Sequence, residues 1–201
     1  MPDAYTIGPS LHTTRRNLPH WQLGGSTYFI TFRLKGTWPR HTPAGTGCTP
    51  PGSTGFQPVF ARPPGSTGFQ PVFAPQERQA VKKCILHWHA VKWHVHALTV
   101  MPDHVHILTR PLEKSTGQWH SLAVILRGVK RQSARAINRL RSRRGPLWQA
   151  ESFDRIVRNQ REFDEKASYI LGNAVTAGLV DDGWLYDGFW CEGMSGMPSA
   201  G

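Results

Sequence analysis

The sequence predicts an α+β fold of the ferredoxin-like, split βαβ type, in which an antiparallel sheet carries helices on one face. Segments with strand or helix periodicity follow one another in the order strand, helix, strand, strand, helix, strand, and a further helix comes after them. The second and third strands are joined by only Met101, Pro102 and Asp103, which implies an antiparallel hairpin. A chain of 201 residues is long enough for one such domain and short for two.

The first strand is predicted over residues 27–34, where aromatic and β-branched residues alternate in TYFITFRL. A helix is predicted over residues 76–92, because apolar residues recur there at helical spacing. The two hairpin strands are predicted over residues 94–100 and 104–110, which are both rich in β-branched and apolar residues. These segments supply the first half of the expected sheet.

A long second helix is predicted over residues 121–141, with one apolar side. The last strand is predicted over residues 148–157, although Glu151 and Asp154 interrupt its apolar pattern. A third helix is predicted over residues 161–173.

One stretch, residues 39–75, does not read as part of a folded core. It holds two identical copies of PPGSTGFQPVFA, at residues 50–61 and 63–74. Prolines remove hydrogen-bond donors and glycines add entropy to the unfolded chain, so an extended, mobile insertion is expected. Because it falls in a loop, the added length costs little in closure entropy, and the fold is expected to survive it.

The expected organisation therefore has three parts. Residues 1–26 form an N-terminal arm, residues 27–180 form the domain interrupted by the insertion, and residues 181–201 form a C-terminal tail. No apolar leader and no run long enough to span a bilayer is present, and the three cysteines form no CxxC pair. A cytoplasmic protein with free thiols is expected, associated with the nucleoid if its partner is DNA.

The charge of the chain favours a polyanionic partner. The formal net charge is +11 and the pI is about 10.2, while only 18% of the residues are charged. Eight bases and no acid lie between residues 127 and 144. Nucleic acid is the leading partner and a membrane surface the weaker alternative. The residues expected to contact DNA phosphates from this helix are Arg127, Lys130, Arg131 and Arg135.

The N-terminal arm offers a second set of candidate DNA contacts. Arg15 and Arg16 lie close in sequence to Trp21, and cations beside an aromatic ring are suited to holding unpaired bases by stacking. Ordinary packing of Trp21 is an equally good interpretation. The basic helix and the arm together therefore predict contacts to single-stranded or hairpin DNA.

Four residues carry the candidate chemistry. His104 and His106 are spaced to project from one face of a strand, and Tyr169 and Asn173 are spaced to project from one face of a helix. Two imidazoles and an amide oxygen are suitable ligands for a divalent cation, and a phenol beside them is a candidate nucleophile for a phosphodiester. His94 and His96 show the same spacing one strand earlier, so spacing alone leaves the choice of histidine pair open.

Five motifs together resemble the REP-associated tyrosine transposases, which are single-tyrosine members of the HUH endonuclease superfamily. The resemblance runs from about residue 15 to about residue 180, with the repeat insertion unmatched. The matching motifs, in order, are RRNLPHW at residues 15–21, TYFITFRL at 27–34, MPDHVHIL at 101–108, PLWQAESFDRIVR at 146–158 and YILGNAVTAGLV at 169–180.

The resemblance implies a ferredoxin-like catalytic domain that acts on single-stranded DNA at hairpin-forming palindromic repeats. It assigns His104 and His106 to a metal-binding pair, Asn173 to a third polar ligand and Tyr169 to the nucleophile. The family motif usually carries a proline after the position of Asn173, whereas this chain has Ala174, so the third helix is expected to run on slightly. It also implies Mg²⁺ or Mn²⁺ as cofactor, a 5′-phosphotyrosine intermediate, and a monomer or homodimer. Two alternatives remain: a nickase of the replication-initiator or relaxase type, and a non-catalytic, domesticated binder of DNA or RNA hairpins.

Overall fold

The computed structural model describes residues 11–15, 19–36 and 72–193, with side chains from residue 23 onward. The first copy of the repeat, most of the second, Arg16 and the side chains of Arg15 and Trp21 lie outside the described residues. The last residues of the second copy, Val72 to Ala74, are described.

A five-stranded antiparallel sheet lies at the centre of the fold, with the strand order β8-β3-β5-β4-β9. Its first four strands in this list have the order expected of a split βαβ unit, in which the third strand of the unit, here β5, lies between the first, β3, and the second, β4. The predicted fold class is therefore confirmed. The elements of this unit are β3 (Thr27–Arg33), α1 (Pro75–Leu86), β4 (Trp93–Val100), β5 (His104–Pro111), α2 (Leu122–Leu140) and β8 (Phe153–Val157).

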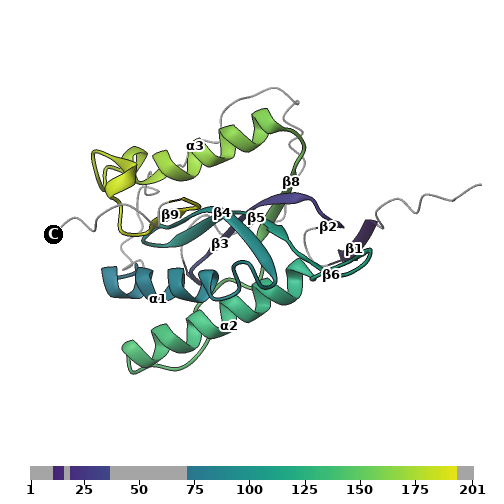
Figure 1. Cartoon of the computed structure of the whole chain (residues 1–201). Helices are drawn as coiled ribbons and strands as arrows, with labels where there is room; N and C mark the ends of the chain where they lie inside the picture. The colour runs from purple at the N-terminus through teal and green to yellow at the C-terminus, as the bar shows by residue number, and fades with distance from the viewer. Residues whose placement is uncertain (1–10, 16–18, 37–71, 194–201) are drawn as a thin grey trace, which may run out of the picture.

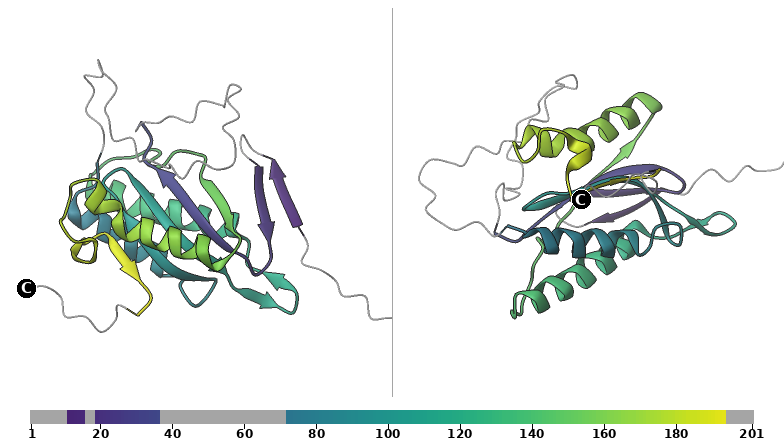
Figure 2. Two further views of the ribbon diagram at one scale, coloured as in Figure 1. Left: turned by 90° about the horizontal axis from the view of Figure 1, so that it is seen from above. Right: turned by 60° about the vertical axis from the view of Figure 1, so that its left-hand side comes forward.

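The helices cover both faces of the sheet. α1 and α2 lie side by side on one face, as the split βαβ arrangement requires, and the third helix, α3 (Gln160–Thr176), crosses the opposite face (Figures 1 and 2). Each face has its own apolar core, because successive strand residues point in opposite directions. On β5, Val105 and Ile107 enter the core under α1 and α2, while Leu108 packs under α3.

Element ends differ from the sequence prediction where tertiary contacts decide them. α1 stops at Leu86, and Ala90 adopts a left-handed φ of 59° in the turn before β4, a conformation that cannot continue a helix. β8 begins only at Phe153, and Trp148 makes a single isolated bridge to Leu34. α3 continues to Thr176, so the expectation that it runs on beyond Asn173 is confirmed.

The end of the repeat stretch belongs to the core, which differs from the expected boundary at residue 75. Phe73 is 2% exposed and its ring meets the ring of Trp148 at 5.3 Å. Glu77 in the first turn of α1 accepts a hydrogen bond from the backbone N–H of Ala74, which fixes how the chain enters the helix. The position of Phe73 is thus decided by its packing in the core, which the proline- and glycine-rich sequence around it does not reveal.

Residues beyond 180, expected to form a tail, fold back onto the domain. The 3₁₀ helix η1 (Gly183–Leu185) packs against α3, and β9 (Phe189–Cys191) pairs with β4 at the edge of the sheet. Glycine is needed at two close approaches: a Cβ on Gly183 would lie 2.1 Å from the carbonyl oxygen of Leu171, and one on Gly188 would lie 2.3 Å from that of Val100.

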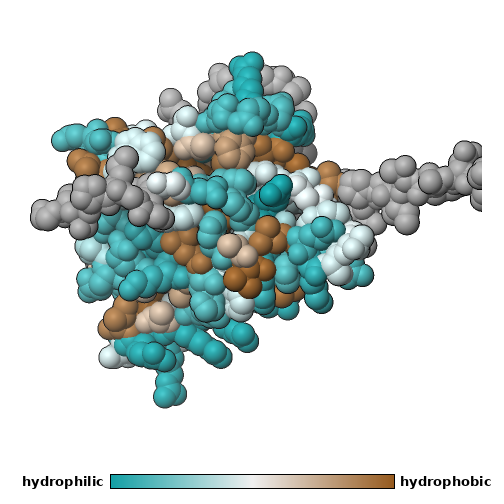
Figure 3. All heavy atoms as spheres, viewed as in Figure 1, coloured by the Kyte–Doolittle hydropathy of each residue, from teal (hydrophilic) through white to brown (hydrophobic). Residues whose placement is uncertain are grey.

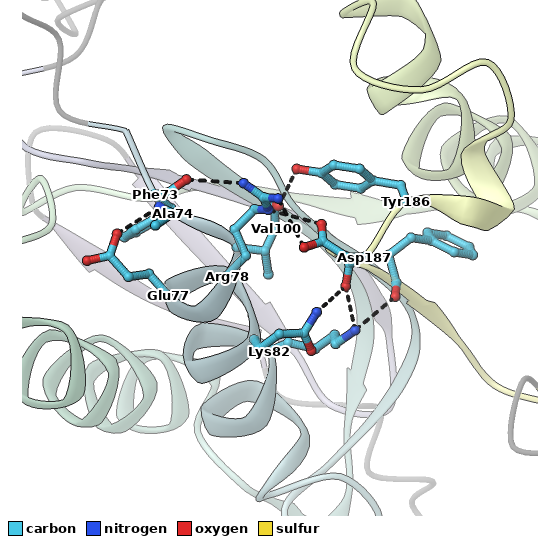
Figure 4. Close-up of polar contacts among 10 residues, drawn as sticks. Phe73, Ala74, Glu77, Arg78, Lys82, Val100, Tyr186 and Asp187 are labelled. Atoms are coloured by element: carbon cyan, nitrogen blue, oxygen red, sulfur yellow. Dashed lines mark hydrogen bonds and ion pairs between the residues drawn. The ribbon is translucent and has the colours of Figure 1, made fainter. Parts of the chain in front are cut away.

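Polar contacts from α1 hold the turn before β9 (Figure 4). The guanidinium of Arg78 donates to both carboxylate oxygens of Asp187 at 3.1 and 3.0 Å, and Lys82 donates to the backbone oxygen of Asp187 at 2.6 Å. The hydroxyl of Tyr186 donates to the backbone oxygen of Val100 at 3.0 Å. The C-terminal segment therefore contacts α1, β4 and α3 together.

Two small hairpins complete the described part of the chain. β1 (Leu11–Arg15) pairs with β2 (Pro19–Leu23), so part of the expected N-terminal arm is a hairpin, which lies near β8 (Figure 2). β6 (Glu113–Ser115) pairs with β7 (Gln118–Trp119). No helix in the described residues is both long enough and apolar enough to cross a membrane.

Candidate active site and a second histidine cluster

His104 and His106 lie on the face of β5 that α3 covers. Both are buried, with exposed fractions of 1% and 2%, and their ring centroids are 4.7 Å apart. The ring of His106 stacks on Phe29 of the neighbouring strand at 5.4 Å. The alternation of β5 thus places two imidazoles side by side between the sheet and α3, as the spacing predicts.

Asp103 orients the ring of His104. Its carboxylate oxygen Oδ1 lies 2.5 Å from Nδ1 of His104, and its other oxygen lies 3.4 Å from the guanidinium of Arg33. A carboxylate accepts a hydrogen bond from Nδ1–H, so the lone pair of His104 is on Nε2. This carboxylate–histidine arrangement is the one that usually supports a histidine ligand to a metal.

Thr31 plays the corresponding part for His106. It is directly opposite His106 in the pairing of β3 with β5, and its Oγ1 lies 2.7 Å from Nδ1 of His106. When the hydroxyl accepts from Nδ1–H, the lone pair of His106 is on Nε2, the nitrogen that faces Tyr169. Both rings therefore have an oxygen partner at Nδ1, in the way that histidine ligands are commonly held.

The electrostatic setting keeps both imidazoles neutral at neutral pH. Burial lowers the pKa of His104, against the opposing effect of Asp103. Burial, the electrostatic interaction with the His104 ring and the positive charges of Arg33 and Lys166 hold the pKa of His106 well below its ordinary value. Neutral imidazole is the form that binds a metal ion, so neither ring needs to lose a proton first.

Tyr169 comes to this pair from α3. Its hydroxyl oxygen lies 3.5 Å from Nε2 of His106, and the two ring centroids are 5.1 Å apart in an edge-on arrangement. Its ring also meets the edge of Phe29 at 5.8 Å. Burial raises the pKa of Tyr169, while the neighbouring Asn173 amide and the charge of Arg33 oppose the shift. The protein therefore holds Tyr169 as a neutral phenol at neutral pH.

Asn173, one helical turn after Tyr169, is 1% exposed. Within the described residues, neither its amide oxygen nor its amide nitrogen has a partner at hydrogen-bonding distance and angle. An unsatisfied buried amide costs about 1–3 kcal/mol, so such a group calls for an explanation. A bound cation that accepts the amide oxygen as a ligand is one explanation that fits the neighbouring imidazoles.

A second cluster lies on β4 and directly after β9. His94, His96 and Glu192 each offer a ligand atom, and these atoms all lie within 4.8 Å of one another. His94 and His96 form the pair that spacing left open against His104 and His106. The ring of His96 meets Phe163 near the start of α3, whereas the ring contacts of Tyr169 are to Phe29 and His106. The phenol thus lies beside the later histidine pair.

The basic residues of α2 lie on the other face of the sheet from Tyr169 (Figure 1). Arg127, Arg131 and Arg135 are exposed at intervals of four residues and so form one stripe. Lys130 is turned to the protein instead, and donates to the backbone oxygens of Gln149, Ala150 and Glu151 at 3.1–3.3 Å. Hydrophilic residues project from the lower margin of the molecule, where α2 lies (Figure 3).

Comparison with known proteins identifies this arrangement of elements. A scan of the sequence against protein families and a search of characterised proteins find no match. A solved structure of a REP-associated tyrosine transposase bound to a REP hairpin does match, with a TM-score of 0.58, over 85% of this chain and 79% of that chain. The fold is that of a REP-associated tyrosine transposase. Because the sequences are only 16% identical, the likeness to the transposase lies in the fold.

Within this transposase fold, sequence reasoning missed three residues that contact the histidines. Asp103 immediately precedes His104, and a carboxylate next to a candidate metal ligand is a usable signal. Thr31 and Glu192 carry no such signal. Thr31 meets His106 only through strand register, and Glu192 reaches His94 only because β9 pairs with β4.

Proposed function

We propose that this chain is a metal-dependent single-stranded DNA endonuclease and strand transferase that works through Tyr169. The observation that carries the proposal is the 3.5 Å approach of the Tyr169 hydroxyl to Nε2 of His106, beside a second imidazole held by Asp103. In this arrangement the phenol can act as the nucleophile toward a phosphodiester, and the two neutral, oriented imidazoles can bind a metal ion beside it. The transposase fold gives this chemistry a precedent.

The residues present fit a divalent metal. His104, His106 and Asn173 would hold it, because the imidazoles are neutral and oriented and the buried Asn173 amide lacks a partner among the described residues. When bound, Mg²⁺ or Mn²⁺ supplies a Lewis acid that polarises a phosphate oxygen. The mixed nitrogen and oxygen donors suit Mn²⁺ at least as well as Mg²⁺.

The proposed reaction is a transesterification. The phenol oxygen of Tyr169 gives up its proton and forms a bond to the scissile phosphorus, while the bond from phosphorus to the 3′ oxygen breaks and that oxygen takes up a proton, so that protons balance over the step. This leaves a 5′-phosphotyrosine and a free 3′-hydroxyl, so the number of phosphodiester bonds is conserved. Attack by the 3′-hydroxyl of a second strand reverses the step and transfers the strand. Because bond energy is conserved, no nucleotide cofactor is needed.

The proposed substrate is single-stranded DNA that folds into hairpins at repeated palindromes. The net charge of +11 and the exposed stripe of Arg127, Arg131 and Arg135 favour phosphate binding, which is not specific for sequence by itself. Arg15, Arg16 and Trp21 of the N-terminal arm are further proposed DNA contacts, whereas Lys130 is left out because its ammonium donates to backbone oxygens of the protein. The stripe lies across the sheet from Tyr169, so hairpin binding and cleavage are expected to be separable.

The decisive experiment incubates the protein with Mn²⁺ and labelled single-stranded repeat DNA, and looks for a protein–DNA adduct that survives denaturation. Tyr169→Phe is expected to abolish the adduct and to leave hairpin affinity within about twofold. Tyr186→Phe is the matched control, because Tyr186 is buried in the same core but bonds to Val100. An adduct of undiminished yield in Tyr169→Phe would remove this tyrosine from the mechanism.

The same assay decides between the histidine pairs. His104→Ala is expected to abolish Mn²⁺-dependent cleavage, and His96→Ala is expected to retain it. The reverse result would assign the catalytic ion to the other cluster. Hairpin binding without an adduct under any metal condition would favour the non-catalytic hairpin-binding alternative.

A further inference from the structure

The second histidine cluster joins the two strands at one edge of the sheet. His94 and His96 lie in the first half of β4, and Glu192 directly follows β9. Antiparallel pairing sets Ala97 opposite Cys191, and the backbone N–H of Glu192 donates to the backbone oxygen of His96 at 3.0 Å. Residues about a hundred positions apart in the chain are thus brought to one point by strand register.

The side chains converge as well. Nε2 of His94 lies 2.8 Å from a carboxylate oxygen of Glu192, and the rings of His94 and His96 have centroids 4.6 Å apart. Ligand atoms of all three side chains lie within 4.8 Å of one another. Three donors at such separations can reach one ion at ordinary coordination distances of about 2.0–2.2 Å with small rotamer changes.

A simple surface ion pair explains only part of this cluster. It accounts for His94 and Glu192, whose side chains are 24% and 55% exposed. It leaves Nε2 of His96 buried and with no hydrogen-bond partner among the described residues. A buried ring nitrogen without a hydrogen-bond partner is unfavourable, and in the tautomer with the proton on Nδ1 the lone pair of Nε2 is available to bind a cation. A cation shared by the three groups provides that missing partner.

We propose that His94, His96 and Glu192 form a second metal site, for a transition-metal ion of the Zn²⁺ class. Two imidazole nitrogens and one carboxylate oxygen are a common set of protein ligands for Zn²⁺, and a water molecule completes the tetrahedron. Mg²⁺ prefers a set made of oxygens and is not the expected occupant; the same preference makes Mn²⁺ the better of the two candidate ions at His104, His106 and Asn173. The two donor sets differ in the anionic carboxylate of Glu192, which replaces the neutral amide of Asn173 and favours an ion of the Zn²⁺ class.

The two sites are also separate in space. His106 is opposite Thr99 in the sheet, and His94 lies five residues before Thr99 on the same strand. At about 3.3 Å per residue, His94 lies roughly 16 Å along the strand from the level of His106, and His96, three residues before Thr99, lies roughly 10 Å from it. One ion cannot serve both clusters, so the two can be removed independently by mutation.

Metal binding at this site is expected to hold β9 against β4. β9 is only three residues long and lies at the sheet edge. The segment before it packs on α3, where Gly183 approaches Leu171, and Phe189 shares a core with Ile170. Metal bound at His94, His96 and Glu192 is therefore expected to stabilise the C-terminal segment against local unfolding. That segment packs on α3, the helix that carries Tyr169.

The test titrates chelator-treated full-length protein with Zn²⁺ alone, in competition with a chromophoric chelator and without DNA. His96→Ala and Glu192→Gln are each expected to lower the affinity for one bound Zn²⁺ ion by at least about tenfold. The matched variant His104→Ala is expected to bind that ion with wild-type affinity. In parallel, Zn²⁺ is expected to raise the thermal midpoint and to slow amide exchange in β9 for His104→Ala but not for His96→Ala.

Two results would overturn the proposal. One is wild-type Zn²⁺ affinity in both His96→Ala and Glu192→Gln. The other is complete loss of Zn²⁺ binding in His104→Ala, which would place the only such site at the other pair. Glu192→Gln guards against misfolding as an explanation, because the Glu192 side chain is more than half exposed. The readout is metal binding and stability, so it does not depend on DNA cleavage.

Discussion

Asp103 offers the sharpest test of how the candidate active site is built. Its carboxylate lies 2.5 Å from Nδ1 of buried His104 and is expected to fix that ring as a ligand. Loss of an oriented partner of this kind costs about 10–100-fold in metal affinity, which corresponds to about 1.4–2.7 kcal/mol. Asp103→Asn keeps an acceptor without its charge and is expected near the lower end of this range. Asp103→Ala removes the acceptor and is expected near the upper end.

The assay is Mn²⁺ binding without DNA, followed by the electron paramagnetic resonance signal of the unbound ion. Arg33→Gln is the matched control, because Arg33 contacts the same carboxylate at 3.4 Å but its charge lowers the pKa of both imidazoles. Removal of that charge is expected to leave Mn²⁺ affinity unchanged or to increase it. Equal affinity in wild type, Asp103→Asn and Asp103→Ala would refute the idea that Asp103 orients a metal ligand.

Two predictions concern stability. Gly183→Ala is expected to lower the free energy of unfolding by about 1–3 kcal/mol, because its Cβ would meet a backbone oxygen of α3, whereas Gly172→Ala, with open space around it, is expected to raise it by up to about 1 kcal/mol. Urea denaturation of both variants checks this, and equal effects would contradict the packing of η1 on α3. Glu77→Gln is expected to cost about 2 kcal/mol near pH 7, because buried Glu77 accepts charge-assisted hydrogen bonds from Arg141. Although burial opposes ionisation, Arg141 and a backbone N–H lower the pKa of Glu77 from 4.5, so the unfolded chain takes up the proton first as pH falls. The stabilisation is thus present above about pH 4.5 and is lost as pH falls through the folded pKa; a difference between wild type and Glu77→Gln that stayed constant down to pH 3 would contradict this account.

The sequence alone determined the order of the elements of the split βαβ unit, with α3 after it, and the direction of the side chains on β5. Alternation in a strand has a period of two, so His104 and His106 had to share a face wherever the strand lay. The three-residue turn before His104 likewise forced β4 and β5 to be antiparallel neighbours. Local periodicity and turn length are properties of short windows, and for this reason they could be predicted without knowledge of the rest of the chain.

The tertiary structure decided which groups meet. The spacing of His94 and His96 equals that of His104 and His106, and only the crossing of α3 over the sheet brings Tyr169 to the later pair. Strand register placed Thr31 on His106, and the return of the chain as β9 placed Glu192 beside His94. Such contacts join residues tens of positions apart in the chain. They depend on how strands are ordered and helices packed, which no short window of sequence records.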